Sequence, residues 1–540
     1  MFRTHLVDIQ YIYIMKFIKG KNRNQIEFFS LDGLIDANNE VRLIDLFVDS
    51  LDWTRLGFNT CFVENGRPAY HPSDLLKLFL YGYLNRIRSS RHLEKECKRN
   101  LEVMWLMRGL VPDHNTIANF RKDNPKAIRK VFRSTVEIAK HFELIGGKLI
   151  AGDSTKLRAQ NSKKNNFNEK KIERHIAYID SKLEEYNRVL AQEDADNEKK
   201  KEAIDKILKH QLHKEKYEHM QEVLKKTECV QISTSDPDSR QMITRNNITE
   251  IAYNVQTTID AKHNIPIDFK VTNQNDSKAM GAMVRRAKTI LGTSDFTALY
   301  DKGYHTGTEF SYANQHGIEV IVAAPEVAAH APDTSFDVEH FQYNKENDEY
   351  TCPQGKTLRT NGRWYNKKHG KTLNRIKHYK TKECLQCHVF SFCTKNKDGR
   401  LIERTEHADL IEANKKRLAE NIQLYRKRQA IAEHPFGIIK RQWDFYYIMT
   451  KKNIHHAQAD VGLIFTSFNL RRIFNIINQN QLKKLLNVLR LAFLFMRNHL
   501  KLITTLFILE NQMHFHKNKS HFILLKWRYL SIFENLITKI

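Results

Sequence analysis

The sequence predicts an α/β protein. We expect a mixed sheet with flanking helices, an N-terminal helical module before it, and two insertions within it, one a helical hairpin and the other Cys-rich. Apolar residues recur at helical spacing between residues 40 and 145, whereas short runs rich in Val, Ile, Thr and Tyr begin at residue 147. A chain of 540 residues with 41% apolar residues is too long for one ordinary domain and has enough apolar residues for packed cores.

Residues 1–145 are expected to form a helical module for DNA binding or dimerisation. The stretch at 71–110 has apolar residues at helical spacing, and a cap at Asn115 or Thr116 is expected to begin a short helix that contains Arg121. This arrangement is typical of a helix-turn-helix reader of DNA. A small helical bundle that only packs on its neighbour fits the pattern equally well.

The sheet is expected within residues 146–164 and 229–330, and residues 411–480 are expected to complete this catalytic core. A helical stretch at 275–291 separates the third and fourth strand-like runs, and a second helix separates the fourth and fifth. That order is typical of a ribonuclease-H-like fold, in which the first and fourth strands are neighbours. The five runs are GKLIAGD, IAYNVQTTID, IPIDFKVT, FTALYD and IEVIVAAP.

Two aspartates are expected at the ends of neighbouring strands. Asp153 would end the first strand and Asp301 the fourth, which places both carboxylates within reach of one metal pair. A third acid, Glu433, lies in the basic helical stretch YRKRQAIAEHPFGIIK, where Pro435 is expected to end or kink the helix. Asp, Asp and Glu are the ligands of a two-metal phosphoryl-transfer site that binds Mg²⁺ or Mn²⁺. The alternative is that the aspartates are turn or cap residues.

The first insertion, residues 165–228, is expected to be an antiparallel helical hairpin. A second, looser apolar series that includes Ile204, Leu208 and Leu212 would form its return helix. Intermolecular coiled-coil pairing is the alternative, and it would make this arm a dimerisation element. The first helix shows a heptad seam of apolar residues: Ile172, Ile176, Ile179, Leu183, Tyr186 and Leu190.

The second insertion, residues 331–410, contains four of the seven cysteines of the chain. Cys384, Cys387 and Cys393 follow the pattern C-x2-C-x5-C, and Cys352 precedes them in the sequence CPQG. A C-x2-C pair supported by two further cysteines suits a tetrahedral structural Zn²⁺ site. The alternative is that these are ordinary reduced cysteines.

The charge of the chain indicates a polyanionic partner. Eighty-eight Lys and Arg face 62 acids, which gives a net charge of +26. The stretch 353–382 has ten Lys or Arg, no acid and three interleaved aromatic residues, a composition suited to phosphates and exposed bases. A generally basic solvated surface is the alternative. The side chains expected to contact DNA here are Arg363, Lys367, Lys368 and Lys371.

Two stretches near the ends of the chain indicate the cellular compartment of the protein. The N-terminus lacks the pattern of a signal peptide, and the apolar stretch at 485–509 carries too many basic residues for a membrane span. We therefore expect a cytoplasmic protein. Translation would start at Met1 or at Met15, and residues 481–540 are expected to form a basic helical tail.

Characteristic motifs are spread over about residues 15 to 480: RPAYHPSDLLKLFLYGYLNRIRSSRHLEKEC, PDHNTIANFR, AGDSTKLRAQNSKK, TSDPDSRQM, YNVQTTID, ALYDKGYHTG, CPQGK, CLQC, YRKRQAIAEHPFGIIKR and FTSFNLRRIF. With these motifs the chain resembles bacterial insertion-sequence transposases of the DDE class, in the branch marked by a Y-R-E-K signature. The resemblance implies that Asp153, Asp301 and Glu433 are the catalytic triad and bind two Mg²⁺ or Mn²⁺ ions.

The signature itself maps onto one segment. Tyr425, Arg428, Glu433 and Lys440 match its residue types, and the resemblance implies that the tyrosine, arginine and lysine hold DNA phosphates. Four residues separate Arg428 from Glu433, where the best-known pattern of the family has three. On a regular helix this spacing would place the two side chains on different faces.

The function implied is that of a transposase. It would bind the terminal inverted repeats of its insertion sequence, cleave double-stranded DNA by Mg-dependent phosphoryl transfer and join the ends to target DNA. We expect a homodimer in a synaptic complex. Two alternatives remain at this stage: a catalytically inactive DNA-binding relative, and a metal-dependent nuclease that does not transpose.

Overall fold

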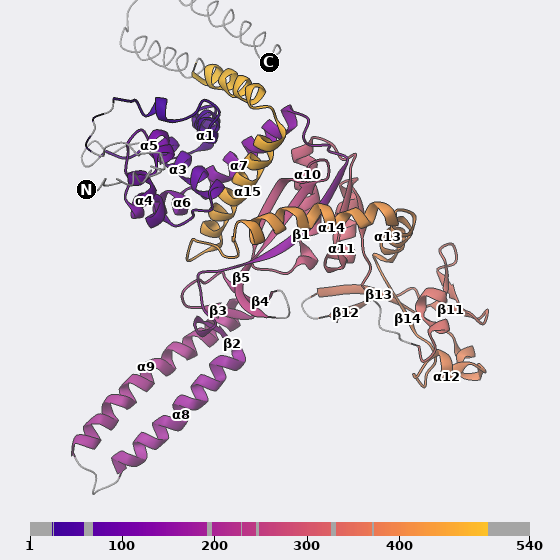
Figure 1. The fold of residues 1–540 in the computed structure, drawn as a ribbon. Helices are drawn as coiled ribbons and strands as arrows, with labels where there is room; N and C mark the ends of the chain where they lie inside the picture. The colour runs from indigo at the N-terminus through magenta and orange to yellow at the C-terminus, as the bar shows by residue number, and fades with distance from the viewer. Residues whose placement is uncertain are drawn as a thin grey trace, which may run out of the picture.

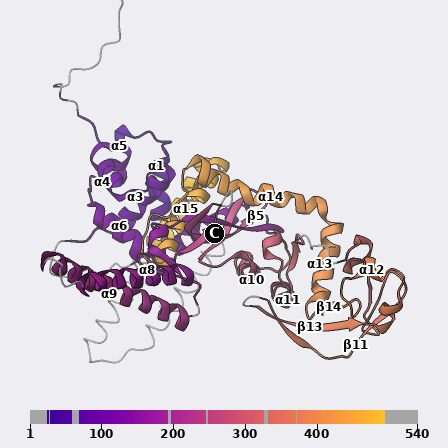
Figure 2. The same cartoon turned by 90° about the horizontal axis from the view of Figure 1, so that it is seen from below.

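The computed structural model describes residues 24, 26, 28–58, 68–191, 197–227, 229–244, 248–325, 331–369 and 372–494. A mixed α/β core lies between an N-terminal helical module and a lobe of short strands, and a long pair of helices projects from the core (Figure 1). Figure 2 shows the module and the lobe at opposite ends of the molecule. The mixed sheet with its flanking helices confirms the α/β fold predicted from the sequence.

Short helices build the N-terminal module, and they begin where polar side chains cap them. In α6 the Asp113 carboxylate accepts hydrogen bonds from the backbone N–H groups of Asn115 and Thr116, so the cap precedes the expected position. The central helix, α3, is buried along its whole length. The helices are α1 (Glu40–Asp49), α2 (Trp53–Leu56), α3 (Pro72–Leu84), α4 (Ser90–Arg99), α5 (Leu101–Leu106), α6 (His114–Asp123) and α7 (Pro125–His141).

The core sheet has its long strands in the middle. Its order is β4-β5-β1-β7-β8, and β6 also pairs with β5. Strand β5 is antiparallel to β1, β4 and β6, whereas β1, β7 and β8 are mutually parallel neighbours. The strands are β1 (Leu149–Arg158), β4 (Arg240–Ile243), β5 (Thr249–Asp260), β6 (Ile265–Thr272), β7 (Thr297–Tyr300) and β8 (Glu319–Val322).

Helices cover both faces of this sheet. On one face α14 (Ile422–Gly437) packs Ile431 and Ala432 against Ala151 of β1 and Leu299 of β7. The apolar residues of α10 (Met280–Leu291) and α11 (Gly307–Gln315) join the main core cluster with the alternate residues of the strands. The alternation of strand side chains therefore separates two apolar layers.

The N-terminal module and the sheet share one hydrophobic core. Helix α15 (Ile454–Ile476) packs against α3, α6, α7 and β6, and a single apolar cluster extends across all of them. Buried Asp460 of α15 accepts a short hydrogen bond from Tyr83 and lies 3.5 Å from both Arg88 and Arg121. The module is thus held to the core by apolar packing and by a buried charged cluster.

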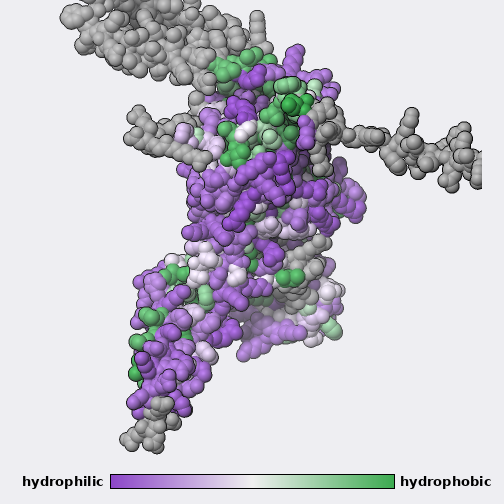
Figure 3. Space-filling view, turned by 60° about the vertical axis from the view of Figure 1, so that its left-hand side comes forward, coloured by the Kyte–Doolittle hydropathy of each residue, from purple (hydrophilic) through white to green (hydrophobic). Residues whose placement is uncertain are grey.

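The arm consists of α8 (Glu169–Ala191) and α9 (Asn197–Thr227), which lie side by side and antiparallel. Lys214 is 2.6 Å from Asp180, and the short strands β2 (Asn166–Asn168) and β3 (Gln231–Ser233) pair at its base. Ile204, Leu208 and Leu212 are exposed along α9. Figure 3 shows hydrophobic patches on this projecting arm within a mostly hydrophilic surface.

The lobe comprises residues 331–369 and 372–405. Its sheet has the order β12-β13-β11-β10-β9, and β14 also pairs with β13. Strands β12 and β13 form a ribbon that extends from the lobe back toward the core (Figure 1). The elements are η6 (Thr334–Phe336), η7 (Val338–His340), β9 (Gln342–Asn344), β10 (Glu349–Thr351), β11 (Thr357–Thr360), β12 (Tyr365–His369), β13 (Thr372–Lys380), η8 (Lys382–Gln386), α12 (Phe390–Cys393) and β14 (Ile402–Thr405).

Helix α13 (Ala408–Glu420) connects the lobe to α14. Its buried Asn414 accepts from the N–H of Val322 at 2.9 Å and donates to the carbonyl of the same residue at 2.8 Å. These two bonds provide partners for the backbone N–H and carbonyl of Val322 on the edge strand β8. Beyond α15, residues 481–494 of the expected tail are helical, and 495–540 lie outside the described residues. No helix in the described ranges is long and apolar enough to cross a membrane.

Candidate active site

Asp153 and Asp301 lie at the same level of two neighbouring parallel strands. Ala151 of β1 pairs with Leu299 of β7. Asp153 lies two residues after Ala151, and Asp301 lies two residues after Leu299. Because strand side chains alternate, both aspartates project from the face that Ala151 and Leu299 share, which is the face covered by α14. Two carboxylates separated by 147 residues of sequence are thus brought to one place.

The prediction that Asp153 ends its strand is wrong. Strand β1 continues to Arg158 because β5 pairs with it along that length, from Ile150 opposite Asp260 to Arg158 opposite Ala252. The pairing with β7 stops earlier, and β7 itself ends at Tyr300. Asp153 therefore lies where one side of β1 becomes open while the other side remains fixed, which provides both access and a rigid support.

A glycine allows the two strands to approach. A Cβ atom on Gly152 would lie 1.9 Å from Cε1 of Tyr300, so the tyrosine ring occupies the space that any other side chain would need. The ring of Tyr300 is fully buried and packs beside Tyr304, with 4.8 Å between the ring centroids. Position 152 therefore requires glycine, because the ring of Tyr300, the residue before Asp301, fills the adjacent space.

Burial raises the pKa of Asp153 to about 6, above its usual value near 3.8. The N–H of Ser154 donates to its carboxylate and the Arg428 guanidinium lies 3.5 Å from Oδ2, and both lower the pKa of Asp153. The nearby carboxylates of Asp301 and Asp276 raise it. A divalent cation supplies the charge that such crowded carboxylates lack, so Asp153 and Asp301 fit as ligands of Mg²⁺ or Mn²⁺.

Tyr425 and Lys440 also reach these strands. The hydroxyl of Tyr425 donates to the carbonyl of Tyr300 at 3.0 Å, and Nζ of Lys440 donates to the carbonyl of Lys156 at 2.9 Å. Pro435 was expected to end or kink the helix, and it does not end it, because α14 runs on to Gly437 and is followed by a π-helical turn, η9 (Ile438–Gln442). That wider turn sets the position of Lys440.

Glu433 is the one member of the expected triad that is not gathered with the others. It is exposed, and it accepts a hydrogen bond from Nε2 of Gln429 at 3.1 Å. Its neighbours Ile431 and Ala432 face the sheet, and a rotation of about 100° per residue turns Glu433 to the flank of the helix. Within the described ranges, no three His, Cys, Asp or Glu side chains are arranged to hold a metal ion.

Asp276 belongs to this neighbourhood and was missed from the sequence. Its carboxylate accepts from Asn254 at 2.7 Å and from Gln256 at 2.6 Å, and it lies 3.1 Å from Nζ of Lys156. These three partners hold the pKa of Asp276 below its usual value despite burial. Asp276 lies in the stretch 275–291 that was expected to be helical, and no pattern there indicated an acid of the site.

The basic ribbon consists of β12, β13 and the turn before β12. Arg363, Lys367 and Lys368 are exposed, whereas Lys371 lies outside the described residues. Lys367 pairs with Glu403. Trp364 is also exposed, and two further cations of β13 lie over its ring at 5.3 and 5.0 Å. The ribbon thus presents cations and an aromatic ring together, as the composition of the segment suggested.

The N-terminal helices do not present Arg121 to a partner. Arg121 is buried, and its Nη1 donates to Tyr83 at 2.9 Å and to the carbonyl of Arg88 at 3.1 Å. The prediction of a DNA reader in this helix is therefore wrong for Arg121, because Asp460 of α15 holds its charge inside the protein. Asn115, in the first turn of the same helix, is exposed.

The four cysteines of the second insertion lie around one cavity in the lobe. Cys352, Cys384, Cys387 and Cys393 line it together, and all four are half-buried free thiols. Cys352 comes from the turn after β10, whereas the other three come from η8, α12 and the segment between them.

Comparison with known families gives two matches. Residues 29–123 match the family described as Transposase domain (DUF772), and residues 351–474 match the Transposase DDE domain. The first match covers α1 to α6 of the N-terminal module, and the second covers the lobe from residue 351 onward, α13, α14 and most of α15. No curated protein matches the chain. The two matches support an insertion-sequence transposase of the DDE class, an enzyme whose substrate is DNA.

Proposed function

We propose that this chain binds the terminal inverted repeats of its insertion sequence, cleaves DNA with divalent metal and joins the ends to target DNA. We further assign it to the branch with the Y-R-E-K signature, with a ribonuclease-H-like catalytic core. The strand order β6-β5-β1-β7-β8, with β5 antiparallel and β7 parallel to β1, supports that core. The observation that carries the proposal is the pair of aspartates, Asp153 and Asp301, at one level of β1 and β7.

The chemistry follows from what these side chains hold. Asp153 and Asp301 would bind two Mg²⁺ or Mn²⁺ ions, with Glu433 as the third acid of the signature. When bound, the ions lower the pKa of an attacking water or 3′-hydroxyl and stabilise the leaving oxygen. Among the described residues, Glu433 has no contact with either aspartate. Its participation therefore requires α14 or its side chain to reorient on DNA.

Side chains of α14 and of the turn η9 after it position the phosphodiester. Arg428 is 3.5 Å from Asp153 Oδ2, so a phosphate brought to the carboxylates also meets its guanidinium. Tyr425 contacts the carbonyl of Tyr300, the residue before Asp301, and Lys440 contacts the carbonyl of Lys156, three residues beyond Asp153 on β1. These residues orient the scissile group without reading the base sequence.

Binding of the DNA duplex outside the active site is assigned to the basic ribbon, with Arg363, Lys367, Lys368 and Lys371. The first three of these side chains are exposed.

The arm at 165–228 is assigned to pairing of two copies in a synaptic complex. Exposed Ile204, Leu208 and Leu212 support that assignment, because an isolated arm leaves this apolar row in water.

The decisive experiment measures cleavage of DNA that carries the element's own ends. Asp153→Asn and Asp301→Asn should each reduce Mg²⁺-dependent strand cleavage by at least about 10³-fold while leaving DNA binding nearly unchanged, since Asn removes only the metal-binding charge. Asp295→Asn is the matched control, because this aspartate is 80% exposed and lies just before β7. Cleavage by either variant at the wild-type rate would refute the assignment.

One observation favours a second candidate, a catalytically inactive DNA-binding relative. Glu433 is exposed, and no metal-binding group of three residues joins it to the two aspartates within the described ranges. The same assay separates the two: wild-type protein that binds the ends and leaves them intact with Mg²⁺ and Mn²⁺ would support the inactive relative. Glu433→Gln should abolish cleavage if the first proposal is correct.

A further inference from the structure

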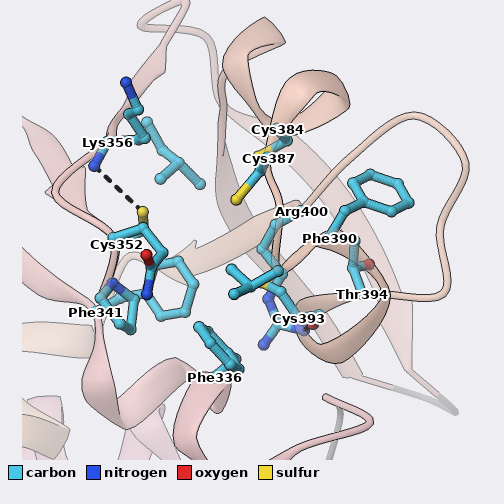
Figure 4. A pocket seen from close by; sticks show the side chains of 14 residues that line it. Phe336, Phe341, Cys352, Lys356, Cys384, Cys387, Phe390, Cys393, Thr394 and Arg400 are labelled. Atoms are coloured by element: carbon cyan, nitrogen blue, oxygen red, sulfur yellow. Dashed lines mark hydrogen bonds between the residues drawn. The ribbon is translucent and has the colours of Figure 1, made fainter.

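The lobe contains a small cavity that has no role in the proposed DNA chemistry. Its volume is about 30 Å³, room for a single ion and far less than an organic ligand needs. Four thiols line it from three segments that are separated by as many as 31 residues in sequence, between Cys352 and Cys384. Figure 4 shows the sulfur atoms of Cys352 and Cys387 directed toward this space.

The turn that carries Cys352 is built to hold a sulfur anion. The N–H of Lys356 donates to Sγ of Cys352 at 3.3 Å, and the N–H of Gly355 donates to the carbonyl of Cys352 at 2.8 Å. Gly355 has a φ of +73°, which the turn requires and which glycine adopts without strain. An N–H group aimed at sulfur stabilises negative charge on it, as expected of a metal-bound thiolate.

A buried arginine supplies an independent indication. Arg400 lines the same cavity and is 6% exposed, and its Nη1 donates to the carbonyl of Cys393 at 3.2 Å. Its Nε and Nη2 have no hydrogen-bond acceptor among the described residues. A buried guanidinium with two unused donors is costly unless negative charge accompanies it. Four thiolates around one Zn²⁺ leave a net charge of about −2, which supplies that partner.

The lobe also lacks enough core to be stable by packing alone. Its apolar cluster has five buried residues, with Cys352 and Cys393 packed at its margin. A unit of fewer than about 80 residues rarely gains enough from such a core, and metal ions commonly supply the remainder. The buried residues are Phe341, Tyr350, Leu358, Tyr379 and Ile402.

We propose that Cys352, Cys384, Cys387 and Cys393 bind one structural Zn²⁺ as thiolates, with Arg400 as the buried counter-charge. The ion holds the lobe folded and so presents the basic ribbon. In the described chain no three metal-ligating side chains are yet gathered at one point, so the thiolates move inward as the ion binds. Such coupling of metal binding to local ordering is usual for small metal-dependent units. The site does not depend on the catalytic aspartates or on the proposed DNA chemistry.

The first test is the metal content of the purified full-length protein. Wild-type protein should contain about one Zn²⁺ per chain, and the double variant Cys384→Ser with Cys387→Ser should contain almost none. Cys229→Ser is the matched control, because Cys229 is exposed and does not line the cavity, and it should retain the zinc. Wild-type protein without zinc, or a double variant that keeps it, would overturn the proposal.

The second test uses wild-type protein, so it does not depend on folding of a cysteine variant. After removal of zinc with a chelator, addition of Co²⁺ should produce the absorption of tetrahedral cobalt together with thiolate-to-cobalt charge transfer. A spectrum without thiolate charge transfer, or a disulfide between Cys384 and Cys387 in freshly purified protein, would contradict a four-thiolate site.

The third test concerns Arg400. Arg400→Gln should weaken zinc binding by roughly 10–100-fold, and Arg400→Lys should restore part of the loss because it restores the charge. Limited proteolysis should show faster cleavage within the lobe in Arg400→Gln, and excess zinc should suppress it. Unchanged zinc affinity in Arg400→Gln would show that the guanidinium does not balance the charge of the site.

Discussion

Replacing Asp153 by asparagine should make the protein more stable at neutral pH while abolishing its proposed activity. Burial and the neighbouring carboxylates of Asp301 and Asp276 raise the pKa of Asp153 to about 6, from a usual value near 3.8. An ionised Asp153 therefore lowers the free energy of unfolding when no metal is bound. Asparagine has nearly the same shape and removes that charge.

The magnitude follows from the size of the shift. Two pKa units correspond to about 3 kcal/mol, and since the side chain is 18% exposed we discount this to about 1–3 kcal/mol. Between about pH 4 and pH 6 the folded chain keeps a proton on Asp153 that the unfolded chain has released. Wild-type protein accordingly loses the contribution of Asp153 to stability as the pH rises through this window, and Asp153→Asn lacks that loss.

The assay compares thermal unfolding of the two proteins in chelator at two pH values. At about pH 7.5 the Tm of Asp153→Asn should exceed that of wild type by about 2–8 °C, and at about pH 4 the difference should nearly vanish. Addition of Mg²⁺ should raise the Tm of wild type alone. Asp295→Asn should show neither effect. A lower Tm for Asp153→Asn at neutral pH would refute the reasoning, because it would mean that the ion pair with Arg428 outweighs desolvation.

Three further outcomes follow from the packing and the surface. Gly152→Ala should lower the Tm by several degrees, because its Cβ would lie 1.9 Å from the ring of Tyr300 and overpacking costs about 1–3 kcal/mol; an unchanged Tm would show that the ring moves freely. Asp460→Asn should destabilise the protein by about 3–5 kcal/mol in denaturant unfolding, since it removes the carboxylate that balances two buried guanidinium groups; a loss below 1 kcal/mol would argue against a structural cluster there. Replacing the basic residues of the ribbon by glutamine should weaken DNA binding for all sequences and reduce the slope of log affinity against log salt by roughly 0.9 per lost phosphate contact; an unchanged slope with lost sequence discrimination would show that these side chains read bases.

Local patterns predicted many of the elements. Alternating or apolar runs indicated the five strands β1, β5, β6, β7 and β8, and helical spacing indicated both helices of the arm. The spacing of 148 positions between Asp153 and Asp301 agrees with the register in which Ala151 pairs with Leu299. These features were readable because each depends on the period of a short segment, and because residues of a repeated pattern occupy one face.

Other features depended on which segments meet in space. The partner strand β5 extends β1 beyond Asp153, and Asp460, 339 residues away, draws Arg121 into the interior. The acid at 276 joins the site only through residues of β1 and β5. None of these has a local signal, because the free energy that fixes them comes from long-range pairing and from burial of charge.

The sequence by itself determined many of the elements, the basic character of the chain and the identities of the acids and thiols that can bind metal. The tertiary structure alone decided that Asp153 and Asp301 face α14 together, that Glu433 lies on the flank of that helix, and that Arg400 enters the cavity of the four cysteines. The physical reason is that the spacing of apolar and polar residues, which identifies a helix or a strand, is a property of one short segment. A side chain's charge environment is set by segments that only folding brings beside it.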